Sequence, residues 1–202
     1  MIVEADMRRV VDAIRAAETR TSGEIFCVVT GASSTYRLVP IAWAALAALL
    51  VPLLLIYLTN WPAGTIYMIQ LATFIVVAVV LSLPAIRYRI VPKRAKHGRA
   101  HVEATRQFLA QGLHLTEQRT GVLIFASIAE HYAEIVADAG INAKVRSEVW
   151  EGAIAAMISA IKDGRPGDGF VAAIERCGTV LAEHFPPGTI NRDELPNKLV
   201  VM

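Results

Sequence analysis

Two long stretches of the chain contain no charged side chain. Residues 38–59 read LVPIAWAALAALLVPLLLIYLT, and residues 65–86 read TIYMIQLATFIVVAVVLSLPAI. An α-helix of about 20 apolar residues crosses the hydrocarbon core of a bilayer. The connection NWPAG contains Pro and Gly, which favour a tight turn. We therefore predict a transmembrane helical hairpin over residues 38–86, and the alternative is a pair of core helices in a larger soluble assembly.

In the flanking residues, 1–37 and 87–202, apolar and polar residues alternate at the spacing of helices and strands, as in a soluble α/β domain. Apolar residues at helical spacing predict amphipathic helices near the N-terminus, over residues 100–113, and twice after residue 147. Two apolar runs predict strands buried on both faces, and one alternating run predicts a strand that forms a hairpin with the second of them. The predicted strands are EIFCVVT (24–30), GVLIFAS (121–127) and YAEIVAD (132–138).

Two buried strands separated by a helix predict a parallel βαβ unit, here with the hairpin inserted in the crossover. The partner strands of EIFCVVT follow the hairpin, so residues 1–37 and 87–202 must fold together. The predicted fold is therefore a small Rossmann-like α/β domain, with a mixed sheet flanked by helices, interrupted by a two-helix transmembrane hairpin. The C-terminal tail has no strong periodicity, and no further element is predicted there.

A strongly basic strip directly follows the second apolar run. It contains no acid, and its basic residues are Arg87, Arg89, Lys93, Arg94, Lys96 and Arg99. Such a strip either binds a polyanion, such as nucleic acid, or lies at the inner surface of a membrane. Its place beside a membrane helix, with no basic residue in NWPAG, follows the positive-inside rule. We predict an inner-membrane protein with both termini and the soluble domain in the cytoplasm. The basic residues of the strip are expected to contact anionic lipid, and no nucleic-acid partner is expected.

Few residues carry a recognisable chemical signature. Cys27 and Cys177 belong to no CxxC or Cys/His cluster, which favours buried thiols over a zinc site. The chain lacks the GxSxG, HExxH, GxGxxG and phosphate-loop motifs. His97 and His101 have i, i+4 spacing, but the surrounding positive charge opposes a bound cation. We expect both histidines to be surface residues.

Polar residues near the predicted strand ends are the candidate ligand contacts. Ser127, Asp138 and Asn142 lie at such positions, where α/β proteins bind ligands. Asp168 is expected to cap the last helix rather than bind a metal, because DGRPGDG lacks the acidic spacing of a calcium loop. Glu130–His131 is expected to face solvent in the turn before the third strand.

Several fragments resemble the TPM domain family and occur in that family's order. They are ETRTSGEIFCVV (18–29), TEQRTGVLIFASIAEHYAEIVADAGI (116–141), the helix around Trp150, GDGFVAAIERCGTVLAEHFP and DELPN. The resemblance implies a compact α/β fold with a Rossmann-like core and an added hairpin strand. This chain departs from the commoner arrangement of a signal peptide, an exported domain and a later anchor. It also has AGINAKV where relatives have an acid-rich loop.

Two functions remain open. The first is a membrane-anchored accessory or regulatory module that acts on another membrane protein. The chain enters the membrane within about eight residues of Thr30, so the carboxyl edge of the sheet is expected to face the bilayer. The second, implied by the resemblance, is a metal-assisted phosphatase-like hydrolase. Ser127, Asp138 and Asn142 would then contact the substrate, and Glu24 or Asp168 would bind a divalent cation; no other cofactor is evident.

Overall fold

The chain forms two compact units in a computed structural model that describes residues 3–187 and 194–202, the side chains of residues 84 and 85 excepted. The α/β unit comprises residues 1–33 and 97–202, and the hairpin unit comprises residues 34–96. The predicted boundaries, after residues 37 and 86, differ from the observed ones by four and ten residues. Tyr36 and Tyr88 explain part of this difference, because their rings pack edge to face within the hairpin unit, with centroids 6.0 Å apart.

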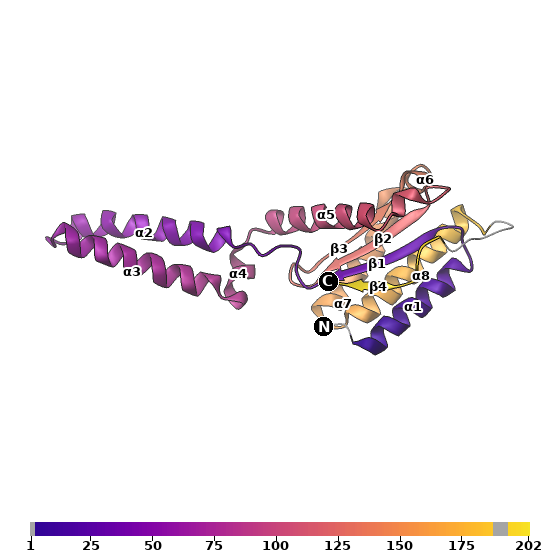
Figure 1. Cartoon of the computed structure of the whole chain (residues 1–202), viewed down its shortest axis with the longest axis horizontal. Helices are drawn as coiled ribbons and strands as arrows, with labels where there is room; N and C mark the ends of the chain where they lie inside the picture. Colours follow the sequence, from indigo (N-terminus) through magenta and orange to yellow (C-terminus); the bar gives the residue numbers. More distant parts are fainter. Residues whose placement is uncertain (1–2, 188–193) are drawn as a thin grey trace. The chain divides into compact units, whose positions relative to one another are not determined.

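The α/β unit contains a mixed four-stranded sheet in the order β3-β2-β1-β4 (Figure 1). Parallel pairing joins β1 to both β2 and β4, and β3 lies antiparallel to β2. The predicted mixed sheet is confirmed, and the first three strands agree with the predicted ones to within one residue. The strands are β1 (Glu24–Thr30), β2 (Gly121–Ser127), β3 (Tyr132–Ala137) and β4 (Leu199–Val201).

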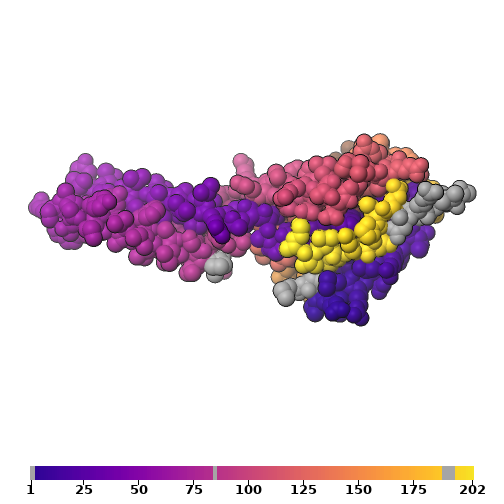
Figure 2. Space-filling model, in the orientation of Figure 1, coloured from indigo at the N-terminus to yellow at the C-terminus, as the bar shows by residue number. Residues whose placement is uncertain are grey.

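Strand β4 is the element that the sequence pattern did not predict. Its three residues pair with Cys27, Val28 and Val29 of β1. Three residues are too few to show a strand period, and the partner lies near the opposite end of the chain. Figure 2 shows the C-terminal segment on the surface of the α/β unit, where β4 forms one edge of the sheet.

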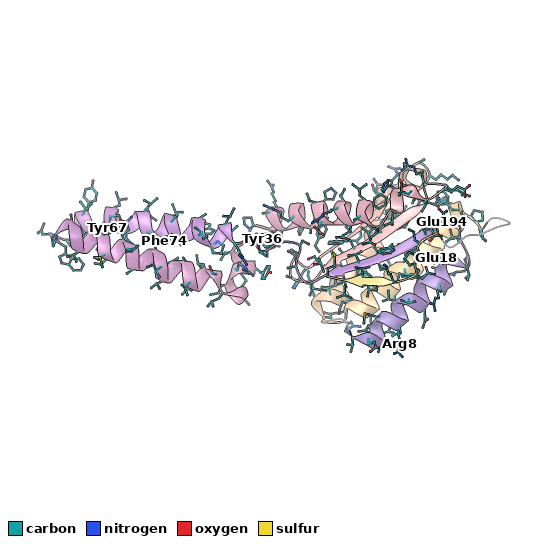
Figure 3. The ribbon with its side chains drawn as sticks, viewed as in Figure 1. Arg8, Glu18, Tyr36, Tyr67, Phe74 and Glu194 are labelled. Atoms are coloured by element: carbon teal, nitrogen blue, oxygen red, sulfur yellow. The ribbon has the colours of Figure 1, made fainter. Side chains whose placement is uncertain are left out.

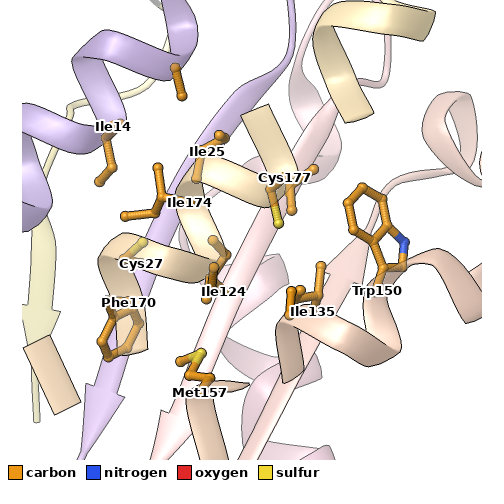
Figure 4. Packing of buried hydrophobic residues seen from close by; sticks show 14 of the residues in the cluster. Ile14, Ile25, Cys27, Ile124, Ile135, Trp150, Met157, Phe170, Ile174 and Cys177 are labelled. Atoms are coloured by element: carbon orange, nitrogen blue, oxygen red, sulfur yellow. The ribbon is translucent and has the colours of Figure 1, made fainter. Parts of the chain in front are cut away.

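Helices cover both faces of the sheet. Alternate residues of β1 and β2 point to opposite sides and form two hydrophobic clusters, one shared with α1, α7 and α8 and the other with α5. Figure 4 shows Cys27 of β1 beside Ile174 and Phe170 of α8 in the larger cluster. The main helices are α1 (Glu4–Glu18), α5 (Lys93–Ala110), α7 (Glu151–Lys162) and α8 (Pro166–His184). The short ones are α6 (Ala139–Asn142) and the 3₁₀ turns η1 (Leu113–Leu115) and η2 (Ser147–Trp150).

Helix α5 begins seven residues earlier than the predicted 100–113 segment. Its apolar period starts only at Ala100, where the helix becomes buried against the sheet. The preceding residues from Lys93 are mainly Lys, Arg and Ala, which favour helix without any apolar period. The helix ends before Gly112, which adopts a left-handed conformation with φ of 74°.

The hairpin unit contains α2 (Leu38–Leu58), α3 (Ala63–Ser82) and α4 (Pro84–Ile90). Both α2 and α3 are long and apolar enough to cross a membrane, and only 17% and 6% of their most apolar windows are buried. The second predicted helix, 65–86, is divided between α3 and α4 in the structure. The break occurs at Leu83, whose ψ of 134° is extended, as expected for a residue that precedes proline.

Candidate functional site

The carboxyl ends of β1 and β2 contain the first predicted site residue, Ser127, which is fully buried. Its hydroxyl donates a hydrogen bond to the carboxylate of Glu130. The other carboxylate oxygen accepts the backbone N–H of Ser33 at 3.0 Å. Glu130 is only 6% exposed, so the expectation that this side chain faces solvent is wrong. The carboxylate instead ties the β2–β3 turn to the segment that follows β1.

The opposite end of the sheet contains Asp138 and Asn142. Asp138 caps α6 by accepting the Ala139 N–H at 2.7 Å, and its second oxygen lies 3.7 Å from the Arg119 guanidinium. Asn142 donates to the Ala137 carbonyl at 2.7 Å. The length of β2 separates this corner from Ser127 by about 20 Å. The structure therefore brings Asp138 and Asn142 together and places Ser127 at the opposite end of β2.

Glu24 lies at the first residue of β1 and is 5% exposed. Its two carboxylate oxygens accept the backbone N–H groups of Glu194 and Leu195, at 3.3 and 3.2 Å. The Glu194 side chain, labelled in Figure 3, accepts the N–H of Glu117 at 3.0 Å. These bonds hold the C-terminal segment that leads into β4. The Glu24 carboxylate thus stabilises the fold at the end of the sheet where β1 begins.

Asp168, the second candidate metal ligand, lies in the first turn of α8. The N-cap of α8 is Arg165, so the predicted capping role is wrong. The Asp168 carboxylate instead accepts hydrogen bonds from Arg9 at 2.8 Å and from Arg165 at 3.2 Å. The Arg9 guanidinium holds the pKa of Asp168 below its ordinary value. Among residues 3–187 and 194–202, no three His, Cys, Asp or Glu side chains gather as metal ligands.

A cluster between α5 and β3 was missed by the sequence analysis. The Nδ1 atom of His101 lies 2.8 and 3.1 Å from the two carboxylate oxygens of Glu134. The Tyr132 hydroxyl donates to the same carboxylate at 2.8 Å, and burial together with this bond raises the pKa of Tyr132. The His97 ring lies 5.2 Å from the Tyr132 ring.

A carboxylate that orients an imidazole leaves the other ring nitrogen available for proton transfer. The signal for this cluster was present in the sequence. Tyr132 and Glu134 are two residues apart on a strand and therefore share a face, and His97 and His101 share a helix face. The pairing of those two faces is a tertiary contact, which the spacing alone does not give.

The basic strip continues from α4 into α5. In α4, the Arg87 guanidinium lies 5.2 Å from the centre of the Tyr88 ring. Among the described side chains, the ion pairs with acidic residues involve other arginines and His101, not the six residues of the strip. Lys93 and Arg94 of the strip are exposed.

Comparison with known proteins places this arrangement in a family. The TPM domain matches residues 75–180, which is more than half of the chain. The chain belongs to the TPM domain family. The matched part of this TPM protein includes β2, β3 and α7, and β1 lies outside it. A search of curated proteins gave no match.

A solved structure shares the fold of this TPM protein. The NMR structure of BA42 protein from the psychrophilic bacterium Bizionia argentinensis superposes with a TM-score of 0.63 at 22% sequence identity. The superposition covers 100% of this chain and 96% of BA42. At this identity the similarity concerns the fold alone.

Proposed function

We propose that this TPM protein is a membrane-anchored accessory or regulatory module of a membrane protein complex. In this proposal, α2 and α3 span the inner membrane, and the α/β unit and both termini lie in the cytoplasm. The observation that carries the proposal is the uncharged α2–α3 hairpin inserted between β1 and β2, with most of its apolar side chains exposed. Exposed apolar surface of this extent is stable in lipid and not in water.

The distribution of charge supports the proposed orientation. Arg37 is the N-cap of α2, and Arg87 and Arg89 lie in α4, so positive charge flanks both hairpin ends that are remote from the α2–α3 turn. The turn between Leu58 and Ala63 has no charged residue. Basic residues of short loops remain on the cytoplasmic side. Each basic residue near an anionic surface contributes about 1 kcal/mol to membrane attraction.

The buried carboxylates favour an accessory role over hydrolysis. Glu24 accepts two backbone N–H groups, and Glu130 accepts one N–H and one hydroxyl. Both side chains thus hold segments of the chain in place. A metal-assisted phosphatase would need such carboxylates directed at an ion or a phosphate. The accessory module is therefore the function that the geometry supports best.

Orientation is tested with cytoplasm-dependent reporters fused to each end of the full chain. We expect both reporters to be active. A variant in which Arg87, Arg89, Lys93 and Arg94 become Gln, with Asn60→Lys and Ala63→Lys in the turn, should lose activity at both ends. A matched control keeps the four basic residues and carries only the two new lysines. Unchanged reporters in the first variant would remove the support for this orientation.

The accessory role is tested by purification in mild detergent after crosslinking in cells. We expect one other membrane protein to copurify in a fixed ratio with the wild-type chain. A monodisperse preparation without any such protein would contradict the accessory role. A parallel assay of phosphomonoester hydrolysis, with and without divalent cation, separates the two functions. Turnover that requires the cation and is lost in Ser127→Ala or Asp138→Asn would favour the hydrolase instead.

A further inference from the structure

The hairpin unit carries charge of one sign only. Residues 34–96 contain six basic residues and no acidic one. Arg37 is the N-cap of α2, and the other five follow α3. None of the six forms an ion pair with an acidic residue that the structure describes. A charged surface of a single sign attracts an anion from outside the chain.

Arg87 differs from its exposed neighbours in this unit. Its guanidinium lies 5.2 Å from the centre of the Tyr88 ring, within the range of a cation–π interaction. Its Nε atom is buried and has no hydrogen-bond partner among the described residues. Arg89, two residues further along α4, is exposed, whereas Arg87 is partly buried. A buried donor without an acceptor is unfavourable, so the Arg87 guanidinium is suited to an acceptor that the chain does not supply.

An aromatic pair holds this guanidinium in place. Tyr36, labelled in Figure 3, is 7% exposed and packs edge to face on Tyr88, with ring centroids 6.0 Å apart. Its φ of 46° lies in the left-handed region, which a tyrosine adopts only where surrounding contacts hold it there. The residues that precede α2 are thereby joined to α4, which packs against α2 (Figure 1). Arg37 and Arg87 therefore lie at the same end of the hairpin.

The length of α3 places Arg87 at the level of the lipid headgroups. The 20 residues of α3 rise about 1.5 Å each, which matches a hydrocarbon core roughly 30 Å thick. The helix ends at Ser82, and α4 begins at Pro84 with Arg87 in its last turn. The polar headgroup layer borders the hydrocarbon core directly. The anion that meets Arg87 at this depth is therefore a lipid phosphate rather than a soluble polyanion.

A phosphate also matches the donors of an arginine. Two neighbouring N–H groups of one guanidinium bind two phosphate oxygens side by side. The single sign of charge in the unit favours a headgroup with net negative charge over a zwitterionic one. We propose that Arg87, stacked on Tyr88, binds the phosphate of one anionic phospholipid at the membrane surface. This site differs from the general attraction of the basic strip, because it depends on one guanidinium and its ring rather than on summed charge.

This inference rests on the proposed membrane insertion, and the experiment separates the two. Flotation of the full chain with phosphatidylcholine vesicles measures insertion alone. Native mass spectrometry in mild detergent then counts bound phosphatidylglycerol during a titration at about 0.3 M salt, where exposed charges are screened. We expect one phosphatidylglycerol to bind more tightly than phosphatidylcholine with the same acyl chains. A chain that does not float contradicts the proposed function and the site with it; a chain that floats but does not prefer phosphatidylglycerol contradicts only the site.

Variants of the two arginines in α4 separate the site from general charge. Arg87→Gln should weaken phosphatidylglycerol binding roughly tenfold, as expected for the loss of a charge-assisted hydrogen bond. Arg87→Lys keeps the charge but loses the paired donors, and it should also weaken binding several-fold. Arg89→Gln is the matched control, since it removes the same charge from an exposed side chain, and it should change binding less than about twofold. Equal weakening by Arg87→Gln and Arg89→Gln, or unchanged binding in Arg87→Lys, would overturn the proposal.

The ring and the source of the phosphate are tested in the same titration. Tyr88→Leu removes the ring beside the guanidinium and should weaken binding several-fold, whereas Tyr88→Phe keeps a ring and should bind like wild type. Inorganic phosphate at the concentration of the lipid should displace none of it, because it lacks the acyl chains that hold a headgroup at this depth. Displacement by inorganic phosphate would assign the site to a soluble phosphate compound and overturn the lipid as its ligand.

Discussion

The strands β1 and β2 and the helices α2 and α3 are all apolar segments, yet their surroundings differ completely. Every residue of β1 and β2 is buried. In α2 and α3, 17% and 6% of the most apolar windows are buried. Composition alone does not distinguish these segments. Length does, because seven residues make a core strand, whereas 21 and 20 residues make helices that can cross a bilayer.

Backbone hydrogen bonding explains why the two kinds of segment coexist in one chain. A strand depends on partners, and β1 finds them in β2 and β4, which both come after the hairpin in the sequence. A helix satisfies its backbone groups internally and needs no partner strand. The hairpin therefore interrupts the fold between β1 and β2 without removing any hydrogen bond from the sheet.

The largest expected effect on stability comes from replacing a leucine with alanine in the α/β unit, compared with the same replacement in the hairpin unit. Leu123 of β2 is fully buried, whereas Leu54 of α2 is 57% exposed. Leu123→Ala should lower the free energy of unfolding of the α/β unit by about 2–5 kcal/mol, because it leaves a cavity in the core. Leu54→Ala should change that free energy by less than about 0.5 kcal/mol.

Trp150 reports this unfolding selectively. It is 3% exposed in the α/β unit, and the remaining two tryptophans, Trp43 and Trp61, belong to the hairpin unit. Urea titration of the full chain in mild detergent, in a Trp43→Phe/Trp61→Phe background, would follow Trp150 fluorescence. Equal midpoints for the two leucine variants would mean that the contrast between the units is wrong.

A charge in the hairpin tests whether the surrounding medium is lipid. Leu49 lies near the middle of α2 and is 64% exposed. Leu49→Arg should disfavour insertion by about 3 kcal/mol, because an arginine at the centre of a membrane helix is unfavourable. Flotation with vesicles should then decrease, whereas Leu49→Val should behave like wild type. Better solubility with unchanged flotation would indicate a hairpin that lies outside the bilayer.

The sequence was sufficient to predict the strands and helices that can be recognised from their own residues alone. The first three strands and the apolar helices were predicted within a few residues. Strand β4 was not, because three residues carry no period and its pairing with β1 joins the two ends of the chain. Glu130 was misplaced for a related reason: its carboxylate accepts a hydrogen bond from the Ser33 N–H, and Ser33 lies before the hairpin in the sequence.

The candidate site was harder to predict than the fold. A residue near a strand end can lie at either end of the neighbouring strands, and Ser127 and Asp138 lie at opposite ends of β2. The pattern of β3 does not by itself show which helix covers it. His101 lies within the predicted helix 100–113, but the spacing of residues in that helix does not show that the helix packs beside β3, where Glu134 lies.

Alkaline pH should affect the α/β unit through its buried thiols. Burial raises the pKa of Cys177 to about 12 and raises that of Cys27 well above its ordinary value of 9.0. Below pH 9 the thiols are protonated in both states, so their contribution to stability is fully present. Above pH 9 the unfolded thiols ionise first, and each should lower the unfolding free energy by about 1 kcal/mol at pH 10.

Urea midpoints at pH 8 and pH 10 measure this effect. The Cys27→Ala/Cys177→Ala variant is the control. It should be less stable at pH 8 because of the lost packing, but its midpoint should fall less between the two pH values. A parallel fall in both proteins would assign the alkaline loss to other groups, such as Tyr132, whose pKa is also raised by burial.

The smallest expected effect concerns the ion pair between α1 and α8. Asp168 accepts a hydrogen bond from Arg9 at 2.8 Å, but both side chains are substantially exposed, so water and salt screen the pair. Asp168→Asn should lower the melting temperature of the α/β unit slightly at pH 7 and low salt. Because Arg9 lowers the folded-state pKa of Asp168, this contribution exists above the ordinary pKa of 3.8 and is lost as the pH falls through the lowered value. Asp12→Asn is the matched control, since Asp12 lies 3.9 Å from Arg15 of its own helix and does not join two elements. A larger loss for Asp12→Asn would show that helix propensity, rather than the contact between α1 and α8, determines the effect.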